Sequence, residues 1–190
     1  AALEGGARLC YESWVTQTVQ SKMERGKLKG TIDTLYCGNS LTYYAYRPQV
    51  LDEVLGTSSF NLATASQPYI GTYYLIRDAV EDNPVRQIYV TVALPPLKEK
   101  AGTRHYVSGF ENMCNWKWKL RYLLAVQKED VWISSLLYTT QIEDYFDLGS
   151  IKANLKNKLV TKEMSSNYAG RGYRYTEDVF QGRENEKNGR

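Results

Sequence analysis

The residues best placed to do chemistry are a serine and its neighbours in a tight turn, Gly38-Asn39-Ser40-Leu41. The turn follows a short apolar run, residues 31–37, whose length and flanking glycines are typical of a buried strand. Ligands of open parallel sheets bind outside the carboxyl ends of the strands, so Ser40 stands where a nucleophile is needed. Its own amide is also suited to stabilise an oxyanion. The alternative, from these four residues alone, is a plain turn in which the serine caps the next helix.

Alternating strand and helix patterns around this turn predict a parallel sheet. Pro48 is placed to begin one helix and Gly56 to end it, and Gly26 is placed to end another. Strand–helix–strand units connect neighbouring parallel strands through right-handed crossovers, so we expect an α/β core. The predicted strands are 31–37, 59–63 and 85–93, and the predicted helices are 6–26, 48–56 and 68–83.

The second half of the chain has a different pattern. Helical spacing predicts helices over 106–126, 129–145 and 151–159 and no further strand. Trp116 and Trp118 are two residues apart on the first of these, so we expect one in the core and one exposed. From Met164 the chain is polar and glycine-rich, and we expect it to bury little and to fray. Because three strands make a narrow sheet, we expect part of a longer protein, divided as 1–30 (lead-in helix), 31–97 (α/β core), 98–163 (helical insertion) and 164–190 (flexible tail).

Composition narrows the class of protein. The formal charge is only +3, and 43% of residues are hydrophobic, which argues against a nucleic-acid partner and against disorder. No apolar run approaches the roughly 18 residues of a membrane helix. Sixteen Tyr and four Trp favour aromatic packing or a surface that grips flat ligands such as sugars. With one His and no metal spacing among Cys10, Cys37 and Cys114, we expect buried thiols, no metal and no cofactor.

Three ordered blocks carry a resemblance to a known family: residues 33–41, 47–56 and 59–67. They resemble the opening of the SGNH (GDSL-like) hydrolases, and especially a membrane-anchored bacterial branch of that superfamily. The helix around 73–77, the strand 88–92 and the Trp-rich helical insertion are similar to the same branch, so the resemblance covers roughly 32–175. It implies a flavodoxin-like three-layer sandwich, incomplete here, whose serine is acylated during ester hydrolysis or O-acyl transfer.

The resemblance also implies a substrate, a location and roles for individual residues. The substrate is an O-acyl group, typically acetyl, on a carbohydrate or cell-wall polymer, and the location is extracellular or at the cell surface, with membrane attachment through a segment absent from this sequence. Ser40 is implied as the nucleophile. Its amide and that of Ala63 or Ser66, where the family's glycines fall, are implied as oxyanion donors. Asn39 and Gln67 are further candidates for substrate contacts. Tyr43, Tyr44 and Tyr46 directly follow the turn, so we expect their rings either to stack against a sugar, which makes Tyr43 and Tyr44 candidate contacts, or to pack against the first helix.

The sequence departs from the family pattern in three places. Asn39 replaces the Asp of the GDSL signature, the Asn expected just after the third strand is missing from 92–96, and the Asp-x-x-His of the last block is absent. His105 lies in a polar segment typical of a surface residue. We therefore expect the nucleophile half of a site without its base, inactive by itself.

Two rival classes remain. A non-catalytic carbohydrate- or partner-binding module on the same fold accounts for the altered blocks and the aromatic content. A receiver or nucleotide-binding domain is disfavoured, because the sequence lacks an acidic cluster at the strand ends and a glycine-rich phosphate loop.

Overall fold

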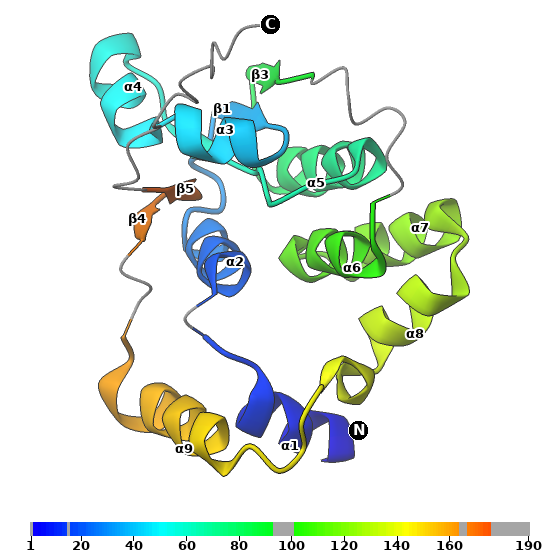
Figure 1. Ribbon diagram of the computed structural model, residues 1–190. Coiled ribbons are helices and arrows are strands. Elements are labelled where there is room, and N and C mark those ends of the chain that lie inside the picture. The colour runs from blue at the N-terminus through cyan, green and yellow to red at the C-terminus, as the bar shows by residue number, and fades with distance from the viewer. Residues whose placement is uncertain (1, 15, 93–100, 164–166, 176–190) are drawn as a thin grey trace, which may run out of the picture.

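The chain forms a mixed α/β fold in which a small parallel sheet lies among helices (Figure 1). The computed structural model describes residues 2–14, 16–92, 101–163 and 167–175, and the structural statements below concern these residues. The strands are β1 (Thr34–Cys37), β2 (Ser59–Asn61), β3 (Gln87–Val90), β4 (Tyr168–Gly170) and β5 (Tyr173–Arg174). The helices are α1 (Ala2–Tyr11), α2 (Gln17–Lys27), α3 (Ser40–Ala45), α4 (Pro48–Leu55), α5 (Tyr69–Asp82), α6 (Thr103–Asn112), α7 (Trp116–Val126), α8 (Glu129–Leu136) and α9 (Leu148–Lys156), with a 3₁₀ turn (Tyr138–Gln141) and a π turn (Asn157–Thr161).

The first three strands form the predicted parallel sheet, in the order β2–β1–β3. Thr34 of the central strand is in register with Ser59 of β2 and with Gln87 of β3. All four residues of β1 are buried, whereas all four of β3, an edge strand, are exposed. The strands are shorter than predicted, and the end of the third predicted strand, from residue 93, lies outside the described residues.

One face of the sheet and three helices share a single hydrophobic core. Leu35 and Cys37 project from the same face of β1, because alternate residues of a strand point the same way. They pack in one cluster with Leu75 of α5, Phe110 of α6 and Tyr122 of α7. Helices α6 and α7, which follow residue 98, are therefore built into the same core as the sheet.

The opposite face of the sheet carries tyrosines. The ring of Tyr36, which is buried in β1, stacks on Tyr46 at a centroid distance of 4.9 Å and on Tyr89 at 5.4 Å. Tyr46 follows α3, so this stack joins the α3–α4 corner to the central and edge strands.

Two helices have the predicted ends. Pro48 occupies the first turn of α4, and Gly56 ends it in the left-handed conformation, at φ 66°. The helix predicted over 68–83 is α5.

The prediction of one continuous helix over 6–26 is wrong. The segment is two helices, because the side chain of Thr16 accepts a hydrogen bond from the amide of Val19 at 3.4 Å and so begins α2 anew. Gly26 lies inside α2, and the cap at its C-terminus is Leu28.

The helix predicted over 106–126 is also two helices, α6 and α7. The carboxylate of Asp78, on α5, accepts hydrogen bonds from the amides of Cys114 at 2.9 Å and Asn115 at 2.8 Å, which pulls the chain out of the helix there. The side chain of Asn115 then caps α7 by accepting from the amide of Lys117. Trp118 is 4% exposed and Trp116 is 66% exposed, which confirms the predicted division between core and surface. The predicted helix 129–145 ends at Leu136, where a 3₁₀ turn takes over.

The prediction that the tail is frayed is wrong for residues 167–175. They form the antiparallel hairpin β4–β5, which packs on α2 and α3. Arg171 makes an ion pair of 3.1 Å with Asp52 of α4, and its carbonyl accepts the amide of Asn61 at 2.9 Å. Tyr168 is buried, and its hydroxyl bonds Glu24. These contacts are long-range, so local polarity does not reveal them; the tail beyond residue 175 lies outside the described residues.

The three cysteines are free, and only Cys37 fits the prediction of buried thiols. Burial raises the pKa of the Cys37 thiol to about 12. Cys10 is half-buried, and Cys114 is exposed in the α6–α7 connection, so the prediction is wrong for these two.

The hairpin gives a stability prediction. Gly172 has φ +78°, and a Cβ added there would lie 1.8 Å from the backbone oxygen of Asn61. We expect Gly172→Ala to lower the free energy of unfolding by about 2–4 kcal/mol, from backbone strain plus displacement of the hairpin. Gly56→Ala is the matched control, because its φ is +66° with no atom near the new Cβ, and it should cost only about 1 kcal/mol. Urea unfolding of both variants tests this; equal losses would contradict the close packing of the hairpin.

Candidate functional site: the turn between β1 and α3

The turn after the central strand brings its backbone close to the next helix. A Cβ at Gly38, where φ is +154°, would lie 2.1 Å from Oγ1 of Thr42, so glycine is required for this close approach. The side chain of Asn39 caps α3 by accepting a hydrogen bond from the amide of Leu41 at 3.1 Å. Asn39 is thus engaged in shaping the turn.

Ser40 is the first residue of α3 and is half-buried. Within the described residues, its hydroxyl has no hydrogen-bond partner, unlike the side chain of Asn39 beside it. The serine therefore lies at the carboxyl end of the central strand with its hydroxyl unengaged. The helix cap of the alternative interpretation is supplied by Asn39 instead.

Asn61, at the end of β2, links the turn that follows β2 to α3 and to Tyr46 just after it. This residue was not identified in the sequence analysis. Its Nδ2 donates to the carbonyls of Thr42 and Tyr46, each at 3.0 Å, and its Oδ1 accepts from the amide of Ala63 at 3.1 Å. The amide of Ala63, an expected oxyanion donor, is thus already engaged. An Asn within an apolar strand is the one sequence signal that points to this role.

The β2–α5 turn places the other two expected residues differently. Ser66 is exposed, and its φ of +46° is in the left-handed region that favours glycine. Gln67 is buried, accepting from Thr64 Oγ1 at 2.9 Å and donating to Thr72 Oγ1 at 2.8 Å. Ser66 is therefore accessible, whereas the Gln67 side chain is occupied inside the turn.

The tyrosines of α3 also divide between core and surface. Tyr43 is buried, and burial raises the pKa of its hydroxyl to about 12, with a further contribution from its hydrogen bond with Tyr44. Tyr44 is 39% exposed, with its ring 4.4 Å from that of Tyr43. Of the two, only Tyr44 offers substantial surface to a ligand.

His105 is not in the polar loop that the sequence suggested. It lies in the first turn of α6 and is half-buried. Gly109, one turn later on α6, lies close to Gly71 at the start of α5, since a Cβ there would be 3.8 Å from the Gly71 Cα. Among the described residues, no hydrogen bond or ion pair links Ser40 to His105 or to an aspartate.

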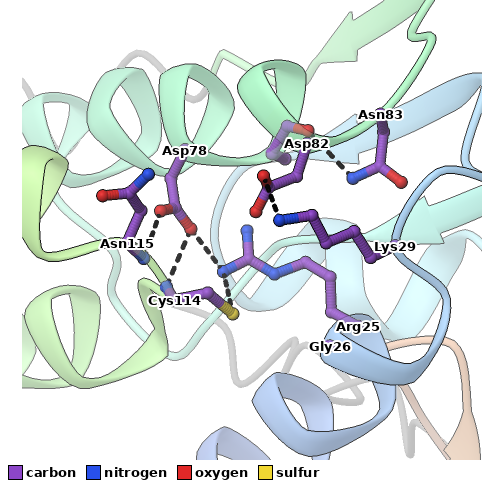
Figure 2. A pocket seen from close by; sticks show the side chains of 9 residues that line it. Arg25, Gly26, Lys29, Asp78, Asp82, Asn83, Cys114 and Asn115 are labelled. Atoms are coloured by element: carbon purple, nitrogen blue, oxygen red, sulfur yellow. Dashed lines mark hydrogen bonds and ion pairs between the residues drawn. The ribbon is translucent and has the colours of Figure 1, made fainter.

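A buried ion pair, which the sequence analysis also missed, joins α2 to α5 (Figure 2). Nη2 of Arg25 lies 2.6 Å from Oδ2 of Asp78, and the two side chains are 3% and 1% exposed. Nη2 also lies 2.7 Å from the carbonyl of Asn112 and 3.2 Å from the sulfur of Cys114. An adjoining cavity of about 320 Å³ holds the Lys29–Asp82 pair at 2.7 Å. Charges are balanced here, so we assign this cluster to holding three helices together.

A larger cleft, the polar cleft, has a volume of about 730 Å³. It lies between the end of α1, the start of α2, one side of α6, and the segment from the end of α8 to α9. Most of its lining residues carry a hydroxyl, carboxyl or amide group, and their carbon atoms add apolar surface. Glu111 of α6 is partly buried in this cleft, and desolvation raises the pKa of its carboxyl.

The raised pKa of Glu111 predicts a pH dependence. Gln141 and Arg8 favour its charged form while burial and Glu12 oppose it, and burial dominates. A carboxyl whose folded-state pKa is raised contributes stability below its unfolded pKa and loses it as pH rises through the folded value. We therefore expect Glu111→Gln to be more stable than the wild type at pH 7 and equally stable below about pH 4. Urea unfolding at both pH values measures this; a variant less stable at pH 7 would contradict it.

Other kinds of site find no support in the described part of the chain. No group of three or more His, Cys, Asp or Glu side chains there is arranged to hold a metal ion. No helix there is both long enough and apolar enough to cross a bilayer.

We compared the chain with family models, with curated proteins and with solved structures. None of the three searches found a match to this chain.

Proposed function

We propose that this chain carries the nucleophile side of an SGNH-type serine esterase or O-acyltransferase site on a flavodoxin-like sandwich. The observation that carries the proposal is the position of Ser40. It begins α3 at the carboxyl end of β1, the central strand of a parallel sheet, with its hydroxyl unengaged among the described residues. This is the edge at which ligands of open α/β sheets bind.

The chemistry follows from these groups. Oγ of Ser40 attacks the carbonyl carbon of an O-acetyl group and loses its proton to a base, and the sugar hydroxyl leaves with a proton. The acyl-serine then passes its acyl group to water or to another hydroxyl. The amides of Ser40 and Ser66 are the two donors for the oxyanion, since the amide of Ala63 is held by Asn61. Tyr44 supplies an exposed ring beside the nucleophile for a sugar.

The base is the group that the proposal still requires. Serine hydroxyl without a general base is a poor nucleophile, and His105 has no described contact with Ser40. We therefore propose that turnover requires a base that is not among the described contacts of Ser40, and that the substrate is an extracellular or cell-surface polymer.

The test is covalent labelling of Ser40 with a fluorophosphonate. The full-length gene product should give one labelled peptide containing Ser40, and Ser40→Ala should give none. Heat-denatured protein is the control for non-specific reaction, because labelling that needs no folded site survives heating. A folded protein that resists the reagent at every pH from 6 to 9 would contradict the esterase proposal.

The second candidate is a non-catalytic carbohydrate- or partner-binding module on the same fold. The observation in its favour is that three groups expected in the site are occupied internally: the Ala63 amide, the Gln67 side chain and the Tyr43 ring. This candidate predicts saccharide binding without labelling of Ser40, which separates it from the esterase.

A further inference from the structure

We propose that the polar cleft binds a short saccharide that carries no negative charge, and that amino groups on the sugar strengthen the binding. The cleft measures about 730 Å³, within the range of about 300–1,000 Å³ typical of small-molecule sites. Its lining residues belong to α1, α2, α6, α8, α9 and the segments that connect them, and do not include the turn that holds Ser40. The inference therefore does not depend on the proposed function of Ser40.

Hydroxyl groups form one wall of the cleft. The hydroxyls of Thr18 on α2 and Ser108 on α6 lie 3.2 Å apart, so each can still pair with a second group. Ser134 of α8 adds a hydroxyl that has no partner among the described residues. Sugar hydroxyls both donate and accept hydrogen bonds, and a wall of protein hydroxyls matches either direction.

Two half-buried tyrosines in the lining, Tyr11 and Tyr138, provide part of the apolar surface on which a sugar ring can pack. One face of the Tyr138 ring is covered by the guanidinium of Arg8, 4.8 Å from the ring centre. Burial, together with the nearby Glu12 and Glu111, raises the pKa of the Tyr138 hydroxyl to about 12, so it remains a donor at neutral pH. Tyr11 lies in the same lining. Tyrosine in such a position combines an apolar body with a polar tip.

The charge of the cleft selects against anions. Its lining includes the carboxylates of Glu12, Glu111, Glu143, Asp144 and Asp147, and its cationic lining residue is Arg104. Arg8 adds one more cation through its 2.9 Å ion pair with Glu12. The cleft is thus acidic although the whole chain carries +3. A neutral sugar meets no charge repulsion in this cleft, and a protonated amino sugar gains attraction from Glu143 and Asp144 at the exposed rim.

The experiment is a calorimetric titration of the wild-type chain with three tetrasaccharides: glucosamine, N-acetylglucosamine and galacturonate. We expect saturable binding of the first two, tighter for glucosamine by about tenfold, and none of the galacturonate. A chain that binds neither of the first two at concentrations up to about 1 mM, or that binds galacturonate best, would overturn the proposal. Ser40→Ala should bind as the wild type does, which keeps this test separate from the esterase test.

Charge reversal at the rim gives a matched pair of variants. Glu143 is exposed and has no hydrogen bond or ion pair among the described residues, so Glu143→Lys should fold normally. We expect it to weaken glucosamine tetramer binding about tenfold and the N-acetylated tetramer less than twofold. Glu53→Lys on α4 is the control, since Glu53 is exposed and outside the cleft. Equal weakening by both variants would mean non-specific attraction by charge and would overturn the assignment to the cleft.

A ring variant tests the cleft without changing its charge. Tyr138→Ala removes a lining ring and should weaken both tetramers by at least fivefold. Circular dichroism establishes that the variant is folded before titration. A folded Tyr138→Ala chain with wild-type affinity for both sugars would overturn the role of the cleft.

Discussion

Ser40→Ala in the full-length gene product is expected to reduce ester turnover by about 10⁴-fold or more, the loss typical of removing a catalytic serine. The variant keeps the fold, because the Ser40 hydroxyl makes no hydrogen bond among the described residues and Asn39 caps α3. Without Oγ there is no acyl-enzyme, so no slower version of the same pathway remains. Hydrolysis of p-nitrophenyl acetate, followed by the visible absorbance of the released nitrophenolate, measures the loss.

The matched control is Thr161→Ala, which removes an exposed hydroxyl that lies outside both the Ser40 turn and the polar cleft. Turnover of this variant should equal that of the wild type. If Ser40→Ala also hydrolyses the ester at the wild-type rate, the nucleophile lies elsewhere and the esterase proposal fails.

Asp78→Asn is expected to lower the free energy of unfolding by about 3–5 kcal/mol, because it leaves the Arg25 charge buried without its partner. The pair is almost completely removed from solvent, with side chains 3% and 1% exposed. Asp78 also accepts the amides of Cys114 and Asn115, and an amide side chain cannot accept all the bonds that the carboxylate accepts. Urea unfolding followed by tryptophan fluorescence measures the change.

Two further variants isolate the cause of that loss. Lys29→Gln breaks the Lys29–Asp82 pair in the same region, but Lys29 is 63% exposed, so we expect a much smaller loss than for Asp78→Asn, because solvent screens an exposed ion pair. The double variant Arg25→Met with Asp78→Asn should be more stable than the sum of the two single losses predicts, since no unpaired charge remains. Purely additive losses would show that the two side chains are not energetically coupled.

Much of the fold could be predicted from local patterns. The parallel sheet, α4 with its Pro48 start and Gly56 end, and α5 all follow from apolar spacing and from residues with restricted backbone angles. The break before α2 is made by a local cap, Thr16, which apolar spacing alone passes over. The break between α6 and α7 could not be found from local patterns. Asp78 interrupts that predicted helix from 36 residues away in the chain, where its carboxylate accepts the amide of Cys114, and periodicity carries no information about such a partner.

The candidate site could be predicted only in outline. The Gly38–Ser40 turn is visible in the sequence because a glycine and a serine follow an apolar strand, and its place at the end of β1 agrees with that prediction. Which neighbours are free depends on the packing between turns. Asn61 accepts the hydrogen bond of the Ala63 amide, and Thr64 and Thr72 bond the side chain of Gln67. The residues expected in the site therefore differ in whether their polar groups are free to bind a ligand.

The sequence by itself determined the three parallel strands with α4 and α5, the turn that presents Ser40 and the division of Trp116 and Trp118 between surface and core, because each depends on residues close together in the chain. Only the tertiary structure decided the docking of the hairpin 167–175, the burial of Arg25 against Asp78 and the existence of the polar cleft. Each of these is made by groups far apart in the chain. Their free energy comes from desolvation and long-range contacts, which local propensity does not record.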